Sequence, residues 1–163
     1  MAGRVDAVRE QFSLFYRCEV GKVTGYVVKV TGATVHEAAD ATQAAFVLAW
    51  ENWTCIRNPR AWVRTVATRE LYRSMPDRRT LAGQALVGDS AVVEPGEAWR
   101  EVVAALAELP LMQRQVLAMT ADDFPDDVIA HELGTTAQAV RQNRSRGRRA
   151  LKAVLSRRRC GDA

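Results

Sequence analysis

The apolar positions in the first thirty residues follow a helical period. They recur in steps of three and four, at Val5, Val8, Phe12, Phe15, Tyr16, Val20, Val23, Val27 and Val30. Because this spacing places side chains on one face of an α-helix, the segment predicts one helix or two. The stretch "YVVKVT" is β-branched enough for a strand, and Gly21 and Gly25 could mark a break. The period runs through both glycines, so a helix is favoured.

Two further helices are predicted before residue 75. The stretch from Val35 to Trp53 is rich in alanine and places Phe46, Trp50 and Trp53 on one stripe. Asn58 can then cap a new helix by accepting a backbone N–H. Pro59 suits its first position, because the missing donor costs nothing there. This third helix is expected to continue to about Arg73.

The second half of the chain changes character twice. Residues 75–96 mix Pro, Gly, Asp and Ser and lose the helical period, which predicts a linker. Helical spacing resumes in "EAWREVVAALAEL" and continues after Pro110 in "LMQRQVLAM". Residues 126–152 predict two helices around a turn at Gly134, the second capped by Thr135 or Thr136. We therefore expect an all-α protein with two small helical domains, residues 1–74 and 97–163, the second containing a helix-turn-helix.

The charge is distributed unevenly along the 163 residues. The formal net charge is +4, yet residues 75–110 carry three Lys/Arg against six Asp/Glu, while both flanking parts are basic. From Arg141 to Arg159 there are nine cations and no acid. Like charges four residues apart on a helix repel each other, so this pattern indicates an external polyanion. A solvated tail would explain the charge alone, but not the neighbouring glycine turn, cap and apolar framework.

The second helix of the helix-turn-helix is the candidate reader of DNA bases. With Val140, Gly147 and Leu151 turned inward, Arg and Gln side chains on the opposite face can make bidentate contacts to guanine and adenine in the major groove. The remaining cations would neutralise phosphates. The candidate residues for the upstream DNA element are Thr136, Gln138, Arg141, Gln142, Ser145, Arg146 and Arg149.

Other classes of site find little support in the sequence. Cys18, Cys55 and Cys160 are widely separated and lack ligand spacing, so we interpret them as reduced thiols. No nucleophile with its base and no glycine-rich phosphate loop occurs, which argues against an enzyme and implies no metal or cofactor. No run of about 18 apolar residues exists, and "MAGRVDAVREQF" lacks the apolar centre of a signal peptide. We expect a cytoplasmic protein.

Two long stretches resemble a known family. "LPLMQRQVLAM" followed by "VIAHELGTTAQAVRQNRSRGRRAL" resembles the C-terminal DNA-binding domain of extracytoplasmic-function (ECF) sigma factors, the small promoter-recognition subunits of bacterial RNA polymerase. "ADATQAAFVLAWENWTCIRNPRAWVRTVATREL" resembles their N-terminal domain, with "FVLAW" and "NPRAWVRTVA" the most specific pieces. The resemblance covers nearly the whole chain, in the correct order. It implies sigma region 2 at residues 1–74 and region 4 at residues 97–163.

The resemblance implies roles for particular positions. Asp40, Gln43 and Val47 match the segment that docks on the largest subunit of the polymerase core, and the helix from Thr136 matches the reader of the minus-thirty-five element. Residues 53–69 match the segment that faces the minus-ten element, where the strands separate. The residue types there agree with this, because cations can bind the backbone and an aromatic ring can stack on an unpaired base. The candidates for this contact are Arg57, Asn58, Arg60, Trp62, Arg64 and Arg69, although core packing is an equal alternative for Trp62.

Three positions depart from the family pattern. Ala44 stands where an acidic residue is usual, Arg144 where leucine is typical, and Gly147 where alanine is typical. A buried unpaired arginine would be costly, so we expect Arg144 to reach solvent or phosphate. The segment "TADDFPDDV" is also more acidic than the family pattern. Ala44 bears on the polymerase contact, and together these departures leave the promoter sequence and the strength of promoter binding open.

The predicted function is therefore an alternative sigma factor that binds core polymerase, recognises promoter DNA and starts transcription. The resemblance also suggests an anti-sigma partner and a monomer in the free state. Two alternatives stay open at this point. One is a helix-turn-helix regulator whose N-terminal helices sense a partner. The other is a sigma-derived interaction protein that no longer reads promoters, for which Ala44 and Arg144 are the motivation.

Overall fold

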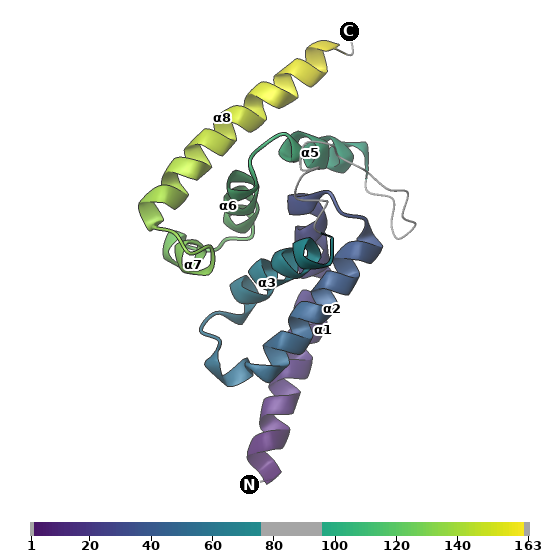
Figure 1. Cartoon of the computed structure of the whole chain (residues 1–163), viewed down its shortest axis with the longest axis vertical. Helices are drawn as coiled ribbons and strands as arrows, with labels where there is room; N and C mark the ends of the chain where they lie inside the picture. The colour runs from purple at the N-terminus through teal and green to yellow at the C-terminus, as the bar shows by residue number, and fades with distance from the viewer. Residues whose placement is uncertain (1, 76–95, 162–163) are drawn as a thin grey trace.

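The computed structural model describes residues 2–75 and 96–161, which form α-helices and one 3-10 helix and contain no strand. The all-α prediction is confirmed. The predicted linker lies almost wholly outside the described residues, so the predicted domain boundaries stay a prediction. The elements in chain order are α1 (Ala2–Thr31), α2 (Val35–Glu51), η1 (Trp53–Cys55), α3 (Pro59–Ser74), α5 (Glu97–Ala107), α6 (Leu111–Ala121), α7 (Asp126–Glu132) and α8 (Ala137–Gly161) (Figure 1).

Helix α1 is a single helix of 30 residues that passes through Gly21 and Gly25 without a break. It ends at Gly32, whose φ of +68° is the left-handed conformation that glycine adopts most easily. Thr34 and Glu37 then form a capping box at the start of α2: each side chain bonds the other residue's backbone N–H, at 3.2 and 2.7 Å. This corner fixes the direction in which α2 returns along α1.

The N-terminal bundle consists of α1, α2 and α3, which pack on one another. Asn58 caps α3 as predicted, with its side-chain oxygen accepting from the Ala61 N–H at 3.2 Å. Helix α2 ends at Glu51, earlier than predicted, and Trp53 begins the 3-10 helix. Trp53 packs edge-on against Phe12 of α1, with ring centroids 5.0 Å apart. The buried core of this bundle comprises Val23, Val27, Val30, Ala45, Phe46, Val63, Ala67 and Leu71.

The C-terminal bundle contains α5, α6 and the helix-turn-helix formed by α7 and α8. Gly134 has a φ of +63°, as the predicted turn requires, and the Thr136 hydroxyl accepts from the Ala139 N–H at 3.1 Å. Val140 is fully buried beneath the turn. Helix α8 continues to Gly161, nine residues beyond the predicted end. Where it crosses α6, a Cβ on Gly147 would lie 3.0 Å from Leu117 Cδ1, so an alanine would need that side chain to move.

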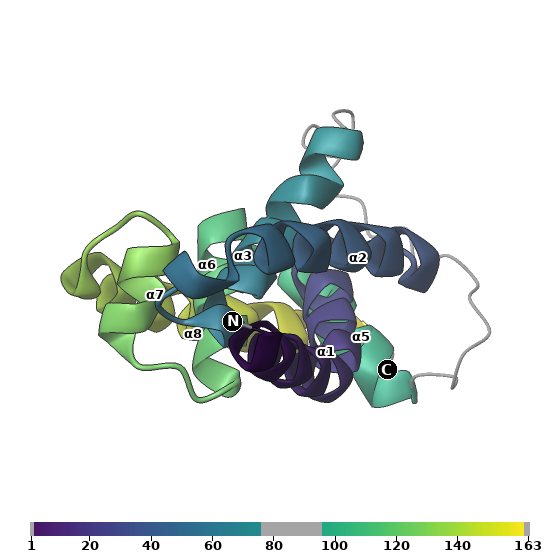
Figure 2. The same cartoon turned by 90° about the horizontal axis from the view of Figure 1, so that it is seen from below.

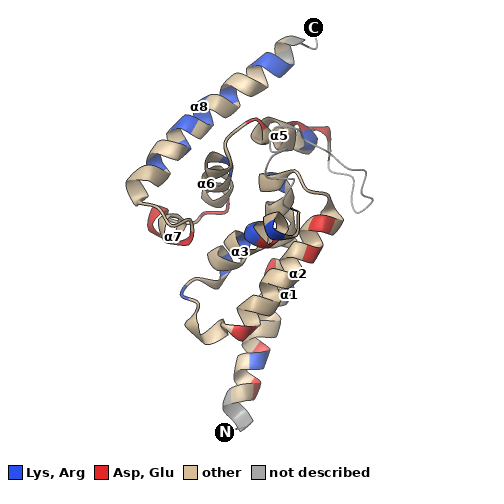
Figure 3. Cartoon of the chain, viewed as in Figure 1, with Lys and Arg blue, Asp and Glu red and all other residues tan. Residues whose placement is uncertain are grey.

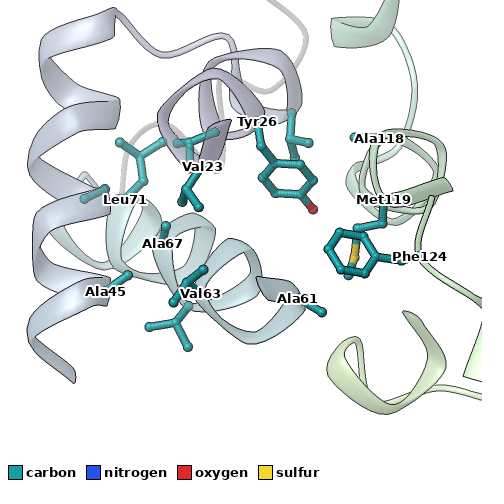
Figure 4. Close-up of a cluster of buried hydrophobic side chains, with 14 of the residues drawn as sticks. Val23, Tyr26, Ala45, Ala61, Val63, Ala67, Leu71, Ala118, Met119 and Phe124 are labelled. Carbon is teal, nitrogen blue, oxygen red and sulfur yellow. The ribbon is translucent and has the colours of Figure 1, made fainter. Parts of the chain in front are cut away.

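The two bundles share a continuous hydrophobic core. Helix α1 packs against α5 and α6, and α3 packs against α7 (Figures 1 and 2). At the centre of this contact, Tyr26 of α1 points toward Met119 and Phe124 of the C-terminal bundle (Figure 4). Burial raises the pKa of Tyr26, and its hydroxyl has no hydrogen-bond partner among the described residues. The N-terminal and C-terminal bundles therefore meet through buried surface.

Candidate nucleic-acid interface

The predicted DNA-reading face of α8 is exposed to solvent. All seven candidate residues, from Thr136 to Arg149, are exposed, and cations follow one another along the helix (Figure 3). Within the described residues, Arg146, Arg148 and Arg149 form no ion pair with the protein's own acids. This surface can therefore bind phosphates and present hydrogen-bond donors to bases.

Arg144 behaves differently from the expectation that it reaches solvent or phosphate. Its guanidinium donates from both terminal nitrogens to the two carboxylate oxygens of Asp126, at the start of α7. This hydrogen bond lowers the pKa of Asp126, and the charges of Arg144 and Arg141 lower it further, against a smaller effect of burial. Arg141 Nη1 lies 3.9 Å from the same carboxylate. The acidic segment before the turn thus supplies the partner for the unusual arginine.

We expect the Arg144–Asp126 pair to show in a double-mutant cycle. Arg144→Leu and Asp126→Asn should each lower the free energy of unfolding, and the double variant should lose less than the sum, by about 1 kcal/mol. The pKa of Asp126 is lower in the folded than in the unfolded state, so this stabilisation is present at neutral pH and lost as the pH falls through the folded pKa. Urea unfolding at pH 7, repeated as the pH is lowered stepwise, measures both effects. Additive losses at pH 7 would contradict the pairing.

At the far end of α8, two more arginines have partners within the protein. Arg157 and Arg158 both bond Glu108, at the end of α5, with the shorter contact at 2.7 Å. Arg157 is largely exposed and Arg158 and Glu108 are partly exposed, so these pairs contribute little to stability. The cationic ridge available to DNA is thus clearest in the first half of α8.

The candidate minus-ten residues, just before and within α3, divide into an exposed and a buried set. Arg57, Arg60 and Arg69 are exposed, while Asn58 is occupied as the cap of the helix. Trp62 is half-buried and packs against the core, which leaves part of its ring accessible. Arg64 is the exception, with 1% of its surface exposed. The three exposed arginines are therefore accessible for a DNA contact, whereas Arg64 is not accessible in this arrangement.

Arg64 lies in a buried network of charges. Its Nε donates to Asp122 Oδ2 at 2.8 Å and its Nη1 to Glu19 Oε2 at 3.0 Å. Burial alone would raise the pKa of Glu19, but hydrogen bonds from Lys22 and Arg64 outweigh it, and the pKa is lowered. Arg60 Nε lies 3.5 Å from the same Glu19 carboxylate. The network keeps Glu19 ionised inside the protein.

The three candidate polymerase contacts share one face of α2. Asp40, Gln43 and Val47 are all exposed, and Val47 has 59% of its surface accessible. Gln43 donates to the Tyr16 hydroxyl at 2.8 Å. Ala44, where an acidic residue is usual in the family, is half-buried beside them. All three side chains are therefore accessible to a protein partner.

Comparison with protein families gives two matches in the chain. The family model described as sigma-70 region 2 matches residues 15–80, and the model described as sigma-70, region 4 matches residues 99–151. The chain belongs to the sigma-70 family. The two regions occur in the order predicted, and the prediction of an ECF sigma factor is confirmed. A comparison with curated protein sequences finds no significant match for this sigma factor.

Two solved structures resemble the sigma factor over most of both chains. The sigma factor RpoE of Bartonella quintana, solved with the anti-sigma factor NepR, has a TM-score of 0.72 at 19% identity, covering 90% of this chain and 98% of that one. CnrH, solved with the cytosolic domain of CnrY, has a TM-score of 0.66 at 21% identity, covering 91% and 89%. At these identities the likeness supports the fold.

Sequence reasoning did not find the residues that join the two bundles. Across the two bundles, Asp122 accepts from Arg64, which Glu19 also holds within the N-terminal bundle, and Arg114 Nη1 donates to the Val30 carbonyl at 2.9 Å. The available signals were a lone acid in the apolar stripe of α1 and the acidic segment after α6.

None of the helices in the described part of the chain is long and apolar enough to cross a membrane.

Proposed function

We propose that this sigma factor binds core RNA polymerase, recognises a bipartite promoter and helps to open it. Region 4 reads the upstream element through α8, and region 2 contacts the polymerase through α2 and the minus-ten element through α3. The observation that carries the proposal is the exposed cationic face of α8, where Arg146, Arg148 and Arg149 lack internal partners among the described residues. Sigma factors direct a polymerase and are not themselves enzymes.

The finer parts of the proposal concern cellular context. The factor acts in the cytoplasm, where core polymerase is found, and is monomeric when free. An anti-sigma factor regulates it by covering the polymerase-binding face. This is supported by the two structural neighbours, since the RpoE structure contains an anti-sigma factor and the CnrH structure contains CnrY. The two regions cover residues 1–74 and 97–163.

Run-off transcription on a fragmented genomic library with purified core polymerase tests the function. The intact factor should bind core stoichiometrically and produce discrete transcripts. Val47→Arg should reduce both at least tenfold, because it places a charge in the proposed apolar contact. Val102→Arg is a matched control, since Val102 of α5 is also exposed and lies in the other region. Sequence-specific DNA binding without core binding would favour a conventional regulator. Sequence-indifferent DNA binding would favour an interaction protein.

A further inference from the structure

A carboxylate at the start of α7 lies between two arginines of α8. Asp126 accepts from both terminal nitrogens of Arg144, with Nη2 at 3.2 Å, and Arg141 Nη1 lies 3.9 Å from Oδ2 of the same carboxylate. Helices α7 and α8 pack on each other, and Figure 3 shows acidic residues on α7 beside the cationic helix α8. Arg141 is a candidate base reader, so Asp126 borders the predicted reading face.

The two arginines take different parts in this cluster. Arg144 uses both terminal nitrogens on Asp126, and its side chain is 23% exposed. Arg141 is 58% exposed, and its Nη1 approaches the carboxylate at a distance longer than that of a hydrogen bond. A guanidinium carries several N–H donors, so the other nitrogens of Arg141 stay available for the two acceptors of a guanine. The cluster therefore occupies Arg144 and leaves Arg141 able to bind a base.

The helix-turn-helix itself holds the carboxylate in place. The Thr135 N–H donates to the Ala130 carbonyl at 2.9 Å, which closes the turn, and Val140 is fully buried beneath it. Ile129 of α7 is also fully buried. Asp126 lies three residues before Ile129 and so on the same side of α7. Its carboxylate thus faces α8 from a backbone that the core fixes.

The carboxylate offsets a repulsion between the two arginines. Arg141 and Arg144 lie three positions apart on α8, which makes them neighbours on the helix surface, where like charges repel. A shared anion balances one of the two positive charges, and its attraction limits the directions in which Arg141 can point. Ordering a long, flexible side chain on binding costs affinity. Because Arg141 is partly ordered before DNA binds, less of this cost remains when it contacts a base.

The same carboxylate is unfavourable for binding DNA in general. The first helix of a helix-turn-helix crosses the DNA backbone, where phosphates repel a negative charge. This repulsion weakens binding to every sequence alike. The ordered Arg141 offsets it only where the preferred base is present, and specificity is the difference between these affinities.

We propose that Asp126 is a positioning residue for base recognition: bound to Arg144, it directs Arg141 toward the upstream promoter element and so raises sequence discrimination while lowering affinity for DNA in general. This inference rests on the proposed function, since it requires α8 to read that element. It also connects the two departures from the family pattern in this part of the chain, the arginine at position 144 and the acidic segment before the turn. Arg144 anchors the carboxylate that acts on Arg141.

Competition binding of the holoenzyme tests this role. The probes are a promoter fragment found by run-off transcription, the same fragment with single-base changes in the upstream element, and a random duplex of equal length. Asp126→Asn, which is isosteric, should reduce discrimination between the preferred and altered elements by about 2- to 12-fold, the cost of ordering one flexible side chain, and should raise affinity for the random duplex. Partial unfolding would lower binding to all probes by the same factor, so a purely structural role leaves this discrimination unchanged.

Asp127→Asn is the matched control. Asp127 is the exposed neighbour of Asp126 on α7 and forms no ion pair within residues 2–75 and 96–161. Removing its charge should raise affinity for all three probes by the same factor, because it lessens the repulsion of phosphates without touching Arg141. A loss of discrimination equal to that of Asp126→Asn would overturn the positioning role, since the effect would then come from net charge.

The variant Arg141→Ala decides whether Asp126 acts through that arginine. Adding Asp126→Asn to Arg141→Ala should cause no further loss of discrimination, because no side chain is left to direct. An undiminished loss in this background, or no loss in Asp126→Asn alone, would overturn the positioning role and leave the proposed function standing. If Arg141→Ala kept full discrimination, or if the intact holoenzyme preferred no sequence, the reading of the upstream element would fail, and the positioning role with it.

Discussion

Arg64→Met is expected to lower the free energy of unfolding by about 3 kcal/mol, because it leaves the Glu19 carboxylate buried without its buried cationic partner. Glu19 is 4% exposed. The two cations that remain near it belong to Lys22 and Arg60, whose side chains are mostly in solvent. The variant also loses the bond to Asp122 across the interface. Urea denaturation followed by circular dichroism at 222 nm measures the loss.

Two companion variants separate charge from packing. Arg69→Met removes an exposed arginine from the same helix and should change stability by less than about 0.5 kcal/mol. Adding Glu19→Gln to Arg64→Met should recover part of the loss, since no buried charge is then left uncompensated. If the double variant were less stable than Arg64→Met alone, the loss would come from packing, and the network would not act through charge.

Arg141→Ala and Gln142→Ala are each expected to reduce discrimination between the preferred and altered upstream elements by about 5- to 150-fold, corresponding to 1–3 kcal/mol per bidentate base contact. Both side chains are exposed in the first two turns of α8, the part of a recognition helix that contacts base edges. Competition binding of holoenzyme to the promoter fragments found by run-off transcription, with single-base changes, measures the discrimination.

Arg148→Ala provides the comparison on the same helix. Arg148 is also exposed but lies two turns further along α8, where a recognition helix leaves the groove and contacts phosphates. Its loss should weaken binding to specific and random DNA by the same factor and make binding less dependent on salt. Equal losses on both DNAs for all three variants would contradict the assignment of Arg141 and Gln142 to base reading.

The helices could be predicted because their signals are local. The apolar period carries α1 through Gly21 and Gly25, the pair Asn58 and Pro59 starts α3, and Gly134 marks the turn before α8. Each signal acts within a few residues of the backbone it shapes, so a single sequence contains it. The end of α2 was less predictable, because Trp53 continues the apolar stripe but leaves the helix to pack against Phe12.

The contacts between the bundles could not be predicted in the same way. Arg64 and Asp122 are 58 positions apart and meet only because α3 lies beside α7 and the end of α6. A cation on a helix stripe is consistent both with a DNA contact and with a buried ion pair, and the sequence favoured the first. The Arg144–Asp126 pair was closer to prediction, since an unusual arginine and an unusual acidic segment were both visible.

Tyr26 weakens the contact between the two bundles at its centre. Its hydroxyl is enclosed between Met119 and Phe124 with nothing to bond among the described residues, and such isolation of a polar group costs about 1–3 kcal/mol. Water would bond that hydroxyl if the contact were absent, so part of the free energy gained by burying the ring is lost at the centre of the contact. The packing of the two bundles is therefore less favourable than its buried apolar area alone would indicate.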